Sequence, residues 1–420
     1  MKTSVDISGV DFRINGKLTY SEVPESHPNA QGLLMNARFI QGVFDDKEDP
    51  DRFARFGWTS WDADRHTDEL IRSLPTWYSY GLRCVTVGFQ GGMPVFTVEN
   101  SSINNNPFSD DGKVIDKAYL ERMDRLIRAA DALGMVVIVS ILYQGQAPRM
   151  RSGAVIRNAV RATCGWLRDN RFTNVIIEVA NEYNIGAFKN HRLVSDPEGI
   201  STLIEIAREE SGGMPVGSSG GGAECSREVA EASDVILIHG NMTRRQDYYR
   251  LINVVKSWGL FRPIVCNEDS PCFTQLDVAY HTHTSWGYYN NLTKQEPPAA
   301  WGIANAEDLF FARRMARGIG ISVESFDEDE QYVLDGLKGR WEWKGQRWVR
   351  LTAEFPEKVD KVEFFLNGDP IDVAYEEPFY VNYEQTWIQK GMPTRPGDKW
   401  RAEIHLVDGR VLVRNATVEA

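Results

Sequence analysis

Short apolar runs alternate with longer amphipathic segments between residues 32 and 320. This alternation is typical of β/α units on a parallel sheet. The predicted strands are Leu33–Phe44, Arg83–Phe89, Met135–Leu142, Asn174–Ala180, Pro215–Ser219, Asp234–His239, Ile264–Asn267 and Thr282–Tyr288. The predicted helices are Asp62–Tyr80, Lys117–Leu133, Ala154–Arg168, Gly199–Glu210, Asp247–Trp258 and Ala306–Ile319.

Eight such units favour an α/β fold of the (β/α)8 TIM-barrel type, which usually takes about 250 residues. A doubly wound open sheet is the alternative. The pattern divides the chain into three parts: an N-terminal hairpin over residues 1–30, the barrel over 31–325, and an all-β sandwich over 340–420. Turn signals at Asn15-Gly16, Asn367-Gly368 and Asp408-Gly409 mark the hairpin and the sandwich. We expect the hairpin to plug the bottom of the barrel.

Composition narrows the choice of partner. The net charge of −12 argues against nucleic acid or an anionic membrane surface, since either would need a basic face. A neutral carbohydrate is indifferent to this charge, and the 12 Trp could serve as stacking surfaces for sugars. No apolar stretch reaches the roughly 18 residues of a membrane span. The sequence leaves compartment and oligomeric state open.

Two glutamates carry the strongest chemical signal. Glu182 follows the apolar run that ends at Ala180, and Glu268 follows the run Ile264–Asn267. Residues just past barrel strands line the catalytic rim, and glycoside hydrolysis uses two carboxylates flanking one bond. Asp269 is the rival to Glu268, although strand alternation would point its side chain the other way.

Other polar residues at strand ends are candidates for binding sugar hydroxyls. Asn181 could bind the sugar 2-hydroxyl, and Gln90 and Tyr143 end the second and third strands. Arg38 lies early in the first strand, so it reads as an interior or bottom-face residue unless a carboxylate partners it.

The ends of four predicted strands resemble glycoside hydrolase clan A, the retaining barrel enzymes that include family 5 cellulases and mannanases. The matching segments are Asn181-Glu182-Tyr183, His239-Gly240-Asn241, Asn267-Glu268-Asp269 and Ser285-Trp286-Gly287. The resemblance implies that Glu182 is the acid/base and Glu268 the nucleophile, with His239 and Asn241 in the cleft and Trp286 as the sugar platform. It implies no cofactor and no metal. The tail over residues 361–417 is similar to bacterial immunoglobulin-like modules.

Two rival functions remain open. His281 and His283 have a His-x-His spacing that occurs in metal-dependent barrel hydrolases. A barrel that binds carbohydrate without cleaving it is the second alternative.

Overall fold

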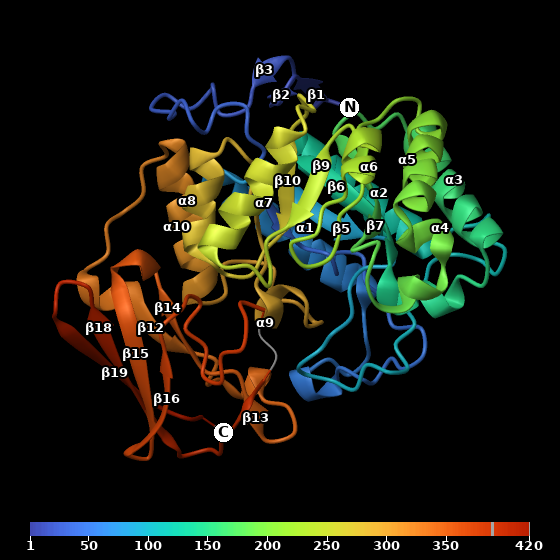
Figure 1. Cartoon of the computed structure of the whole chain (residues 1–420). Coiled ribbons are helices and arrows are strands. Elements are labelled where there is room, and N and C mark those ends of the chain that lie inside the picture. The colour runs from blue at the N-terminus through green and yellow to red at the C-terminus, as the bar shows by residue number, and fades with distance from the viewer. Residues whose placement is uncertain (388–389, 420) are drawn as a thin grey trace.

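The computed structural model describes residues 1–387 and 390–419 (Figure 1). Eight parallel strands form a closed ring. Backbone hydrogen bonds join its two sheets, from Asp234 to Val216 at one junction and from Cys266 to Ser285 at the other. The ring strands are β4 (Asn36–Arg38), β5 (Cys84–Gly88), β6 (Val136–Tyr143), β7 (Val175–Asn181), β8 (Val216–Gly217), β9 (Ile236–His239), β10 (Ile264–Glu268) and β11 (Gly287–Tyr288). The predicted TIM barrel is confirmed.

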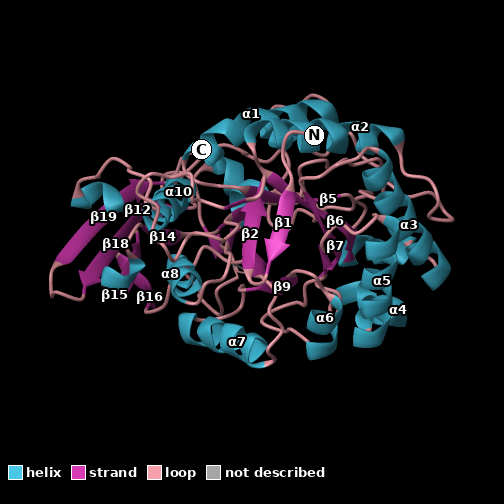
Figure 2. Cartoon of the chain, turned by 90° about the horizontal axis from the view of Figure 1, so that it is seen from above, coloured by secondary structure: helices cyan, strands magenta, loops and turns pink. Residues whose placement is uncertain are grey.

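Helices surround the ring, as the view along the barrel in Figure 2 shows. Local sequence sets their ends: Asp116 caps the start of α2 through Ala118 N–H, and Gly134 ends it in the left-handed region with φ 81°. The helices are α1 (Ala63–Ser79), α2 (Lys117–Leu133), α3 (Gly153–Asp169), α4 (Arg192–Ser195), α5 (Pro197–Glu210), α6 (Arg227–Ala232), α7 (Arg245–Ser257), α8 (Phe273–His281), α9 (Asn291–Lys294) and α10 (Ala306–Ile319).

Three predicted strands were clearly too long, and of the fifth, Pro215–Ser219, only Val216–Gly217 is strand. The first covers only Asn36–Arg38, because the chain turns at Phe39–Gly42 and at Gln41–Phe44; Phe39 and Phe44 are buried by these turns instead of by the sheet. The eighth covers only Gly287–Tyr288, and the helix α8, which the sequence prediction missed, precedes it. Phe273, Leu276 and Ala279 form the buried face of α8.

The N-terminal hairpin lies over the amino end of the barrel strands (Figure 2). It consists of β1 (Val5–Ser8), β2 (Asp11–Ile14) and β3 (Lys17–Leu18). Val5 and Phe12 pack in one buried cluster with residues at the beginning of the strands, among them Cys84, Val136 and Val265. This end of the barrel is therefore covered, and the opposite end carries the candidate site.

The C-terminal part is an all-β sandwich. A four-stranded antiparallel sheet in the order β16-β15-β18-β19 packs against the pair β12-β14. Burial alternates along β18, as a sheet with one buried face requires. The strands are β12 (Tyr332–Asp335), β13 (Gln346–Arg347), β14 (Arg350–Ala353), β15 (Val359–Leu366), β16 (Asp369–Ala374), β17 (Met392–Pro393), β18 (Lys399–Leu406) and β19 (Val411–Thr417).

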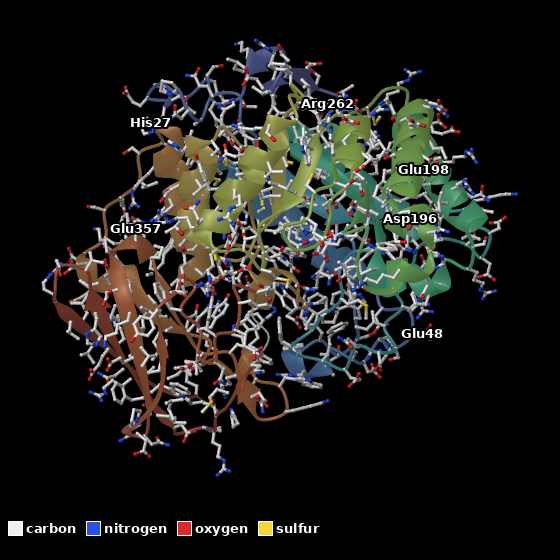
Figure 3. All side chains as sticks on the ribbon, in the orientation of Figure 1. His27, Glu48, Asp196, Glu198, Arg262 and Glu357 are labelled. Atoms are coloured by element: carbon white, nitrogen blue, oxygen red, sulfur yellow. The ribbon has the colours of Figure 1, made fainter. Side chains whose placement is uncertain are left out.

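Ion pairs join the sandwich to the barrel. Arg313 of α10 lies 2.7 Å from Glu354, and Arg350 lies 2.8 Å from Glu307. All four side chains are buried, whereas Glu357, labelled in Figure 3, forms a more exposed pair with Arg314. Within the described ranges, no helix is both long enough and apolar enough to cross a membrane.

Candidate active site

Three barrel strands bring Glu182, His239 and Glu268 together at their carboxyl ends. Glu182 directly follows β7, and His239 and Glu268 are the last residues of β9 and β10. His239 Nδ1 lies 3.2 Å from Glu182 Oε1 and 3.7 Å from Glu268 Oε2. One carboxylate oxygen of each glutamate and one imidazole nitrogen all lie within 4.8 Å of one another.

The backbone at Glu182 is held in an unfavourable conformation. Its φ is 55°, in the left-handed region that residues other than glycine rarely adopt. The Glu182 N–H donates to Ser219 Oγ at 3.1 Å, which fixes this turn. The Glu182 side chain is 15% exposed, so it can meet a ligand.

Glu268 is held from two sides. Arg38 Nε lies 2.8 Å from Glu268 Oε2, and Asn241 Nδ2 donates to Oε1 at 2.8 Å. Arg38 therefore has the carboxylate partner that the sequence analysis left open, and it belongs to the candidate site. Because Arg38 and Asn241 each hold one oxygen, the carboxylate plane of Glu268 is fixed.

These contacts determine the proton affinities. Burial raises the pKa of Glu268, while Arg38 and His239 limit the rise. Burial also acts to raise the pKa of Glu182, but the hydrogen bond with His239 and the charge of Arg38 outweigh it, so the Glu182 pKa lies below its usual value. For His239, burial acts to lower the pKa, but Glu268 and Glu182 prevail and raise it. Both directions favour a proton on the imidazole of His239 over one on the carboxyl group of Glu182.

A third carboxylate lies deeper in the barrel. Glu178 is fully buried, and its Oε1 accepts from Ser219 Oγ at 2.7 Å and from Asn267 Nδ2 at 2.9 Å. Ser219 thereby links Glu178 to the backbone of Glu182. Burial acts to lower the pKa of Arg38, but the negative charge of Glu268 outweighs it and raises that pKa. The charge of Glu178 adds to the rise.

Several buried polar atoms around the glutamates have no hydrogen-bond partner among the described residues. They are Asn181 Oδ1, His239 Nε2, Asn241 Oδ1 and Arg38 Nη1. Buried polar atoms are normally paired, so such a group of unpaired atoms is typical of a site that receives a polar ligand. Sequence reasoning named Asn181, His239 and Asn241 as ligand-binding residues, and the structure brings them together.

Trp286 requires a correction. It is fully buried, its indole N–H donates to Asp269 Oδ2 at 2.6 Å, and its ring packs on Phe311. The residue precedes β11 instead of following it, so it belongs to the core and does not offer a free ring face to a sugar. The same hydrogen bond gives the Asp269 carboxylate a partner in the core, whereas Glu268 contacts Arg38 and Asn241.

Gln90 and Tyr143 lie beside the site but differ in availability. Gln90 Oε1 accepts from Tyr143 N–H at 2.7 Å, and Gln90 Nε2 donates to Asn106 Oδ1 at 2.9 Å. Gln90 is thus fully buried and joins the end of β6 to the loop that contains Asn106, so both ends of its side-chain amide are already hydrogen-bonded within the protein. Burial raises the pKa of Tyr143, and the charges of Glu182 and Glu268 add to it, which places the phenol within the field of both carboxylates.

The histidine pair proposed for a metal does not reach the site. His283 Nε2 lies 2.7 Å from Asp11 Oδ1 of the N-terminal hairpin, at the opposite end of the barrel. His281 is exposed at the end of α8. Neither belongs to a group of metal-ligating side chains in the described part of the chain, so a metal centre built on them is contradicted.

Sequence reasoning missed Tyr289 and Glu178 as neighbours of the site. The Arg38 guanidinium lies 5.4 Å from the centre of the Tyr289 ring, and Tyr289 is almost fully buried. A carboxylate inside the apolar run Val175–Ala180 is the signal that could have identified Glu178, since buried charges need partners.

Comparison with known proteins gives structural neighbours only. No protein-family model matches the chain, and no curated protein matches its sequence. The similar solved structures include a calcium-binding mutant of Bacteroides uniformis β-glucuronidase 2, with a TM-score of 0.46 and 9% identity over 99% of this chain and 47% of that chain. B. uniformis β-glucuronidase 3 gives a TM-score of 0.43 and 11% identity, over 99% of this chain and 51% of that chain.

The endo-β-1,4-mannanase from Thermotoga petrophila gives a TM-score of 0.47 and 11% identity, over 92% of this chain and 97% of that chain. The present chain spans about half the length of the two β-glucuronidases. These structural neighbours are glycoside hydrolases. At such scores and identities, the likeness assigns neither a family nor a substrate to this chain.

Proposed function

We propose that the protein is a retaining glycoside hydrolase in which Glu268 is the nucleophile and Glu182 the acid/base. The observation that carries this proposal is the approach of one oxygen of each glutamate within 4.8 Å, with His239 contacting both. Retaining enzymes separate their two carboxyl groups by about 5–5.5 Å, whereas inverting enzymes need about 6.5–9.5 Å to admit a water molecule. The substrate class is a β-linked glycan or oligosaccharide.

In the first step, an oxygen of Glu268 attacks the anomeric carbon and the bond to the leaving oxygen breaks. A proton passes from His239 to Glu182 and from Glu182 to that oxygen, which leaves Glu182 as a carboxylate and His239 neutral. Formation of the ester removes the charge of Glu268, which is the main influence that raises the His239 pKa. His239 therefore releases its proton more readily as the glycosyl-enzyme forms.

In the second step, Glu182 accepts a proton from water, and the resulting hydroxyl attacks the anomeric carbon. The ester bond to Glu268 breaks, the carboxylate is restored, and the proton returns to the Glu182–His239 pair. Both displacements invert the anomeric centre, so the product retains the original configuration. The unpaired atoms of Asn181, Asn241 and Arg38 would bind sugar hydroxyls, which both donate and accept hydrogen bonds.

A panel of aryl β-glycosides and β-linked polysaccharides tests this proposal. We expect turnover by the wild type, loss of turnover in Glu268→Ala, and recovery of Glu182→Ala by azide or by substrates with good leaving groups. Glu198 is exposed on α5 (Figure 3), and Glu198→Ala is the matched control that should retain activity. Equal loss in Glu182→Ala on all substrates, with no azide rescue, would contradict the acid/base role.

A metal-dependent reaction is the second candidate, because Glu182, His239 and Glu268 together offer three ligand atoms. Metal ligation needs a neutral imidazole, whereas the two glutamates raise the pKa of His239 and favour its protonated form. Turnover that survives EDTA would favour the glycosidase mechanism. Binding of glycans without any turnover would instead indicate a silent sugar-binding barrel.

A further inference from the structure

The C-terminal sandwich reaches the candidate site through residues 375–387, the segment between β16 and β17. On one side, the Met242 N–H donates to Thr386 Oγ1 at 2.8 Å. Met242 follows Asn241, whose amide holds Glu268. The segment is therefore next to the loop after β9 that orients the proposed nucleophile.

The neighbouring residue contacts a loop from across the barrel. The ring of Trp387 lies 5.8 Å from that of Phe96, in the loop after β5. Glu296 fixes this loop, because its Oε1 accepts from the Val95 N–H at 2.7 Å and the Phe96 N–H at 3.2 Å. Strands β5 and β9 are the second and sixth of eight, so a segment that contacts the loops after both must extend across part of the barrel mouth.

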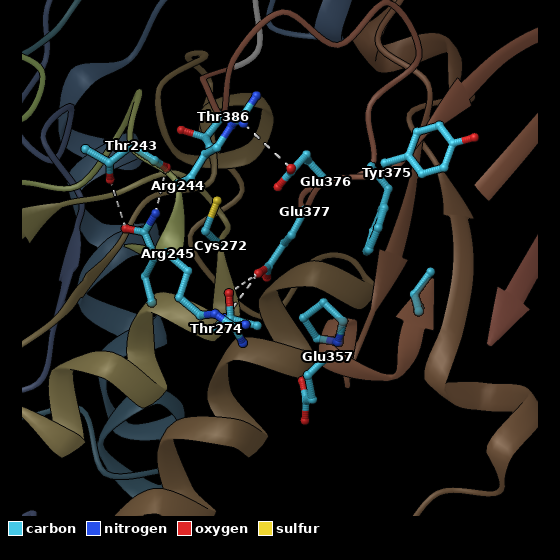
Figure 4. A pocket seen from close by; sticks show the side chains of 14 residues that line it. Thr243, Arg244, Arg245, Cys272, Thr274, Glu357, Tyr375, Glu376, Glu377 and Thr386 are labelled. Atoms are coloured by element: carbon cyan, nitrogen blue, oxygen red, sulfur yellow. Dashed lines mark hydrogen bonds and ion pairs between the residues drawn. The ribbon is translucent and has the colours of Figure 1, made fainter. Parts of the chain in front are cut away.

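The segment is anchored at its beginning as well. Glu377 accepts from the backbone N–H groups of Phe273 and Thr274 at the start of α8, and from Thr274 Oγ1 at 2.5 Å. Figure 4 shows the contact of Glu377 with Thr274 and the pair between Arg244 and Glu376. They line a polar pocket of about 220 Å³ between the domains. Because both ends of residues 377–386 are held by the barrel, their place over the mouth is determined by the fold.

Aromatic side chains concentrate where this segment meets the barrel. Phe96 and Leu292 of the barrel form a buried cluster with Trp341, Trp348 and Tyr380 of the C-terminal part. Tyr383 and Trp387 pack against this cluster but remain partly exposed. A ring that is supported on one side and accessible on the other can pack on the apolar face of a sugar ring.

We propose that Tyr383 and Trp387 of the C-terminal sandwich form a wall of the sugar cleft and supply a subsite beyond the sugar that is cleaved. This inference rests on the proposed glycosidase function and specifies its substrate as an oligosaccharide longer than a disaccharide. It gives the sandwich a direct part in substrate selection. It also accounts for the low exposure of Glu268 and Asn241, each 5% exposed, since a segment from a second domain lies over their side of the mouth.

Two substrate lengths test the proposal. Kinetics of wild type, Trp387→Ala and Tyr383→Ala are compared on an aryl monoglycoside and on cello-, manno- and xylohexaose. We expect KM for the cleaved hexaose to rise about tenfold in each variant, with kcat on the aryl monoglycoside within twofold of wild type. Trp387→Phe, which retains a ring, should recover most of the loss. Tyr375 is 66% exposed in the same segment (Figure 4), and Tyr375→Ala is the matched control.

Calorimetric binding of the three hexaoses to a Glu268→Gln background separates this inference from the proposed function. Weaker hexaose binding after Trp387→Ala supports the wall whether or not the wild type turns over. Unchanged hexaose binding and KM in both variants would overturn it, as would an equal effect of Tyr375→Ala or no hexaose binding by the Glu268→Gln parent. If the wild type turned over none of the substrates while Trp387→Ala still weakened hexaose binding, only the proposed function would be contradicted.

Discussion

Arg38 and Glu268 are far apart in sequence, yet each supplies the charge that stabilises the other in the barrel interior. Both side chains are buried, at 2% and 7% exposure, and they meet at 2.8 Å. Removing one member of a buried ion pair leaves a charge that costs about 3–5 kcal/mol. At the residue scale, the first strand therefore controls the ionisation of a carboxylate on the seventh.

Arg38→Met tests this control. Arg38 lowers the pKa of Glu268, so its loss should raise that pKa and move the acidic limb of the kcat/KM profile to higher pH. A nucleophile must be ionised, so we expect kcat/KM near pH 6 to fall roughly 100-fold, equivalent to about 3 kcal/mol. The exposed Arg72→Met is the control. An unshifted acidic limb in Arg38→Met would show that Arg38 does not act through Glu268.

The sequence identified most residues of the site because their chemistry is local. Glu182, Asn181 and Glu268 each close an apolar run, which places them at the strand ends where sites occur. The part of Arg38 could not be predicted, because its partner depends on how the ring closes. Trp286 was misjudged because the resemblance placed its ring at the barrel mouth, whereas the residue precedes β11 and its ring is buried in the core.

At the element scale, the turn after β9 depends on the close approach of Gly240 to the side chain of Asp269. A Cβ atom on Gly240 would lie 2.3 Å from Asp269 Oδ2, so no larger residue fits between His239 and Asn241. The helices and central strands were predictable because their periodicity is strong. The first and eighth strands were not, because residues in the turns beside them resemble strand residues when only the sequence is read.

Gly240→Ala should destabilise the protein by about 1–3 kcal/mol, the usual cost of overpacking. It should also lower activity, since the displaced loop carries Asn241. Thermal unfolding and kinetics measure the two effects. A Cβ on Gly302 would meet nothing within 4 Å, so Gly302→Ala is the control. If both variants had the same melting temperature, the close approach at Gly240 would be contradicted.

At the scale of the whole molecule, buried ion pairs join the two parts of the chain. Glu354 is fully buried and pairs with Arg313 and Arg317, each at 2.7 Å. The sequence predicted the barrel and the all-β sandwich, but it could not show that the sandwich docks on α10 or extends over the barrel mouth. Such contacts depend on the relative placement of two domains, for which single-sequence periodicity holds no signal.

Glu354→Ala should cost about 3–5 kcal/mol, because it leaves the buried Arg313 without its partner. Denaturant unfolding measures the loss. Glu357 pairs with Arg314 but is 37% exposed, so Glu357→Ala should cost less than about 1 kcal/mol. Equal losses in the two variants would mean that the buried pair does not join the domains.

Stability should fall as the pH rises from about 4.5 to 7. Burial raises the pKa of Glu296 to about 7, so the folded state keeps a proton that the unfolded state has lost. This stabilisation is complete below the unfolded pKa of 4.5 and is lost as the pH passes through 7, a difference of up to about 3 kcal/mol. Glu296→Gln should make the decline of the melting temperature between pH 5 and 8 less steep, and Glu307 and Glu377, whose pKa values burial also raises to about 7, account for the part that remains. An equally steep decline in that variant would contradict the assignment.

The central claim is that Glu268 forms a covalent bond with the sugar. Mass spectrometry of the protein treated with the 2-deoxy-2-fluoro glycoside of a cleaved sugar tests it most directly, since such a substrate slows release of the intermediate. We expect one added glycosyl group, located in the digested protein on Glu268. A label on Asp269 or elsewhere, or turnover that yields the inverted anomer without a label, would contradict the mechanism.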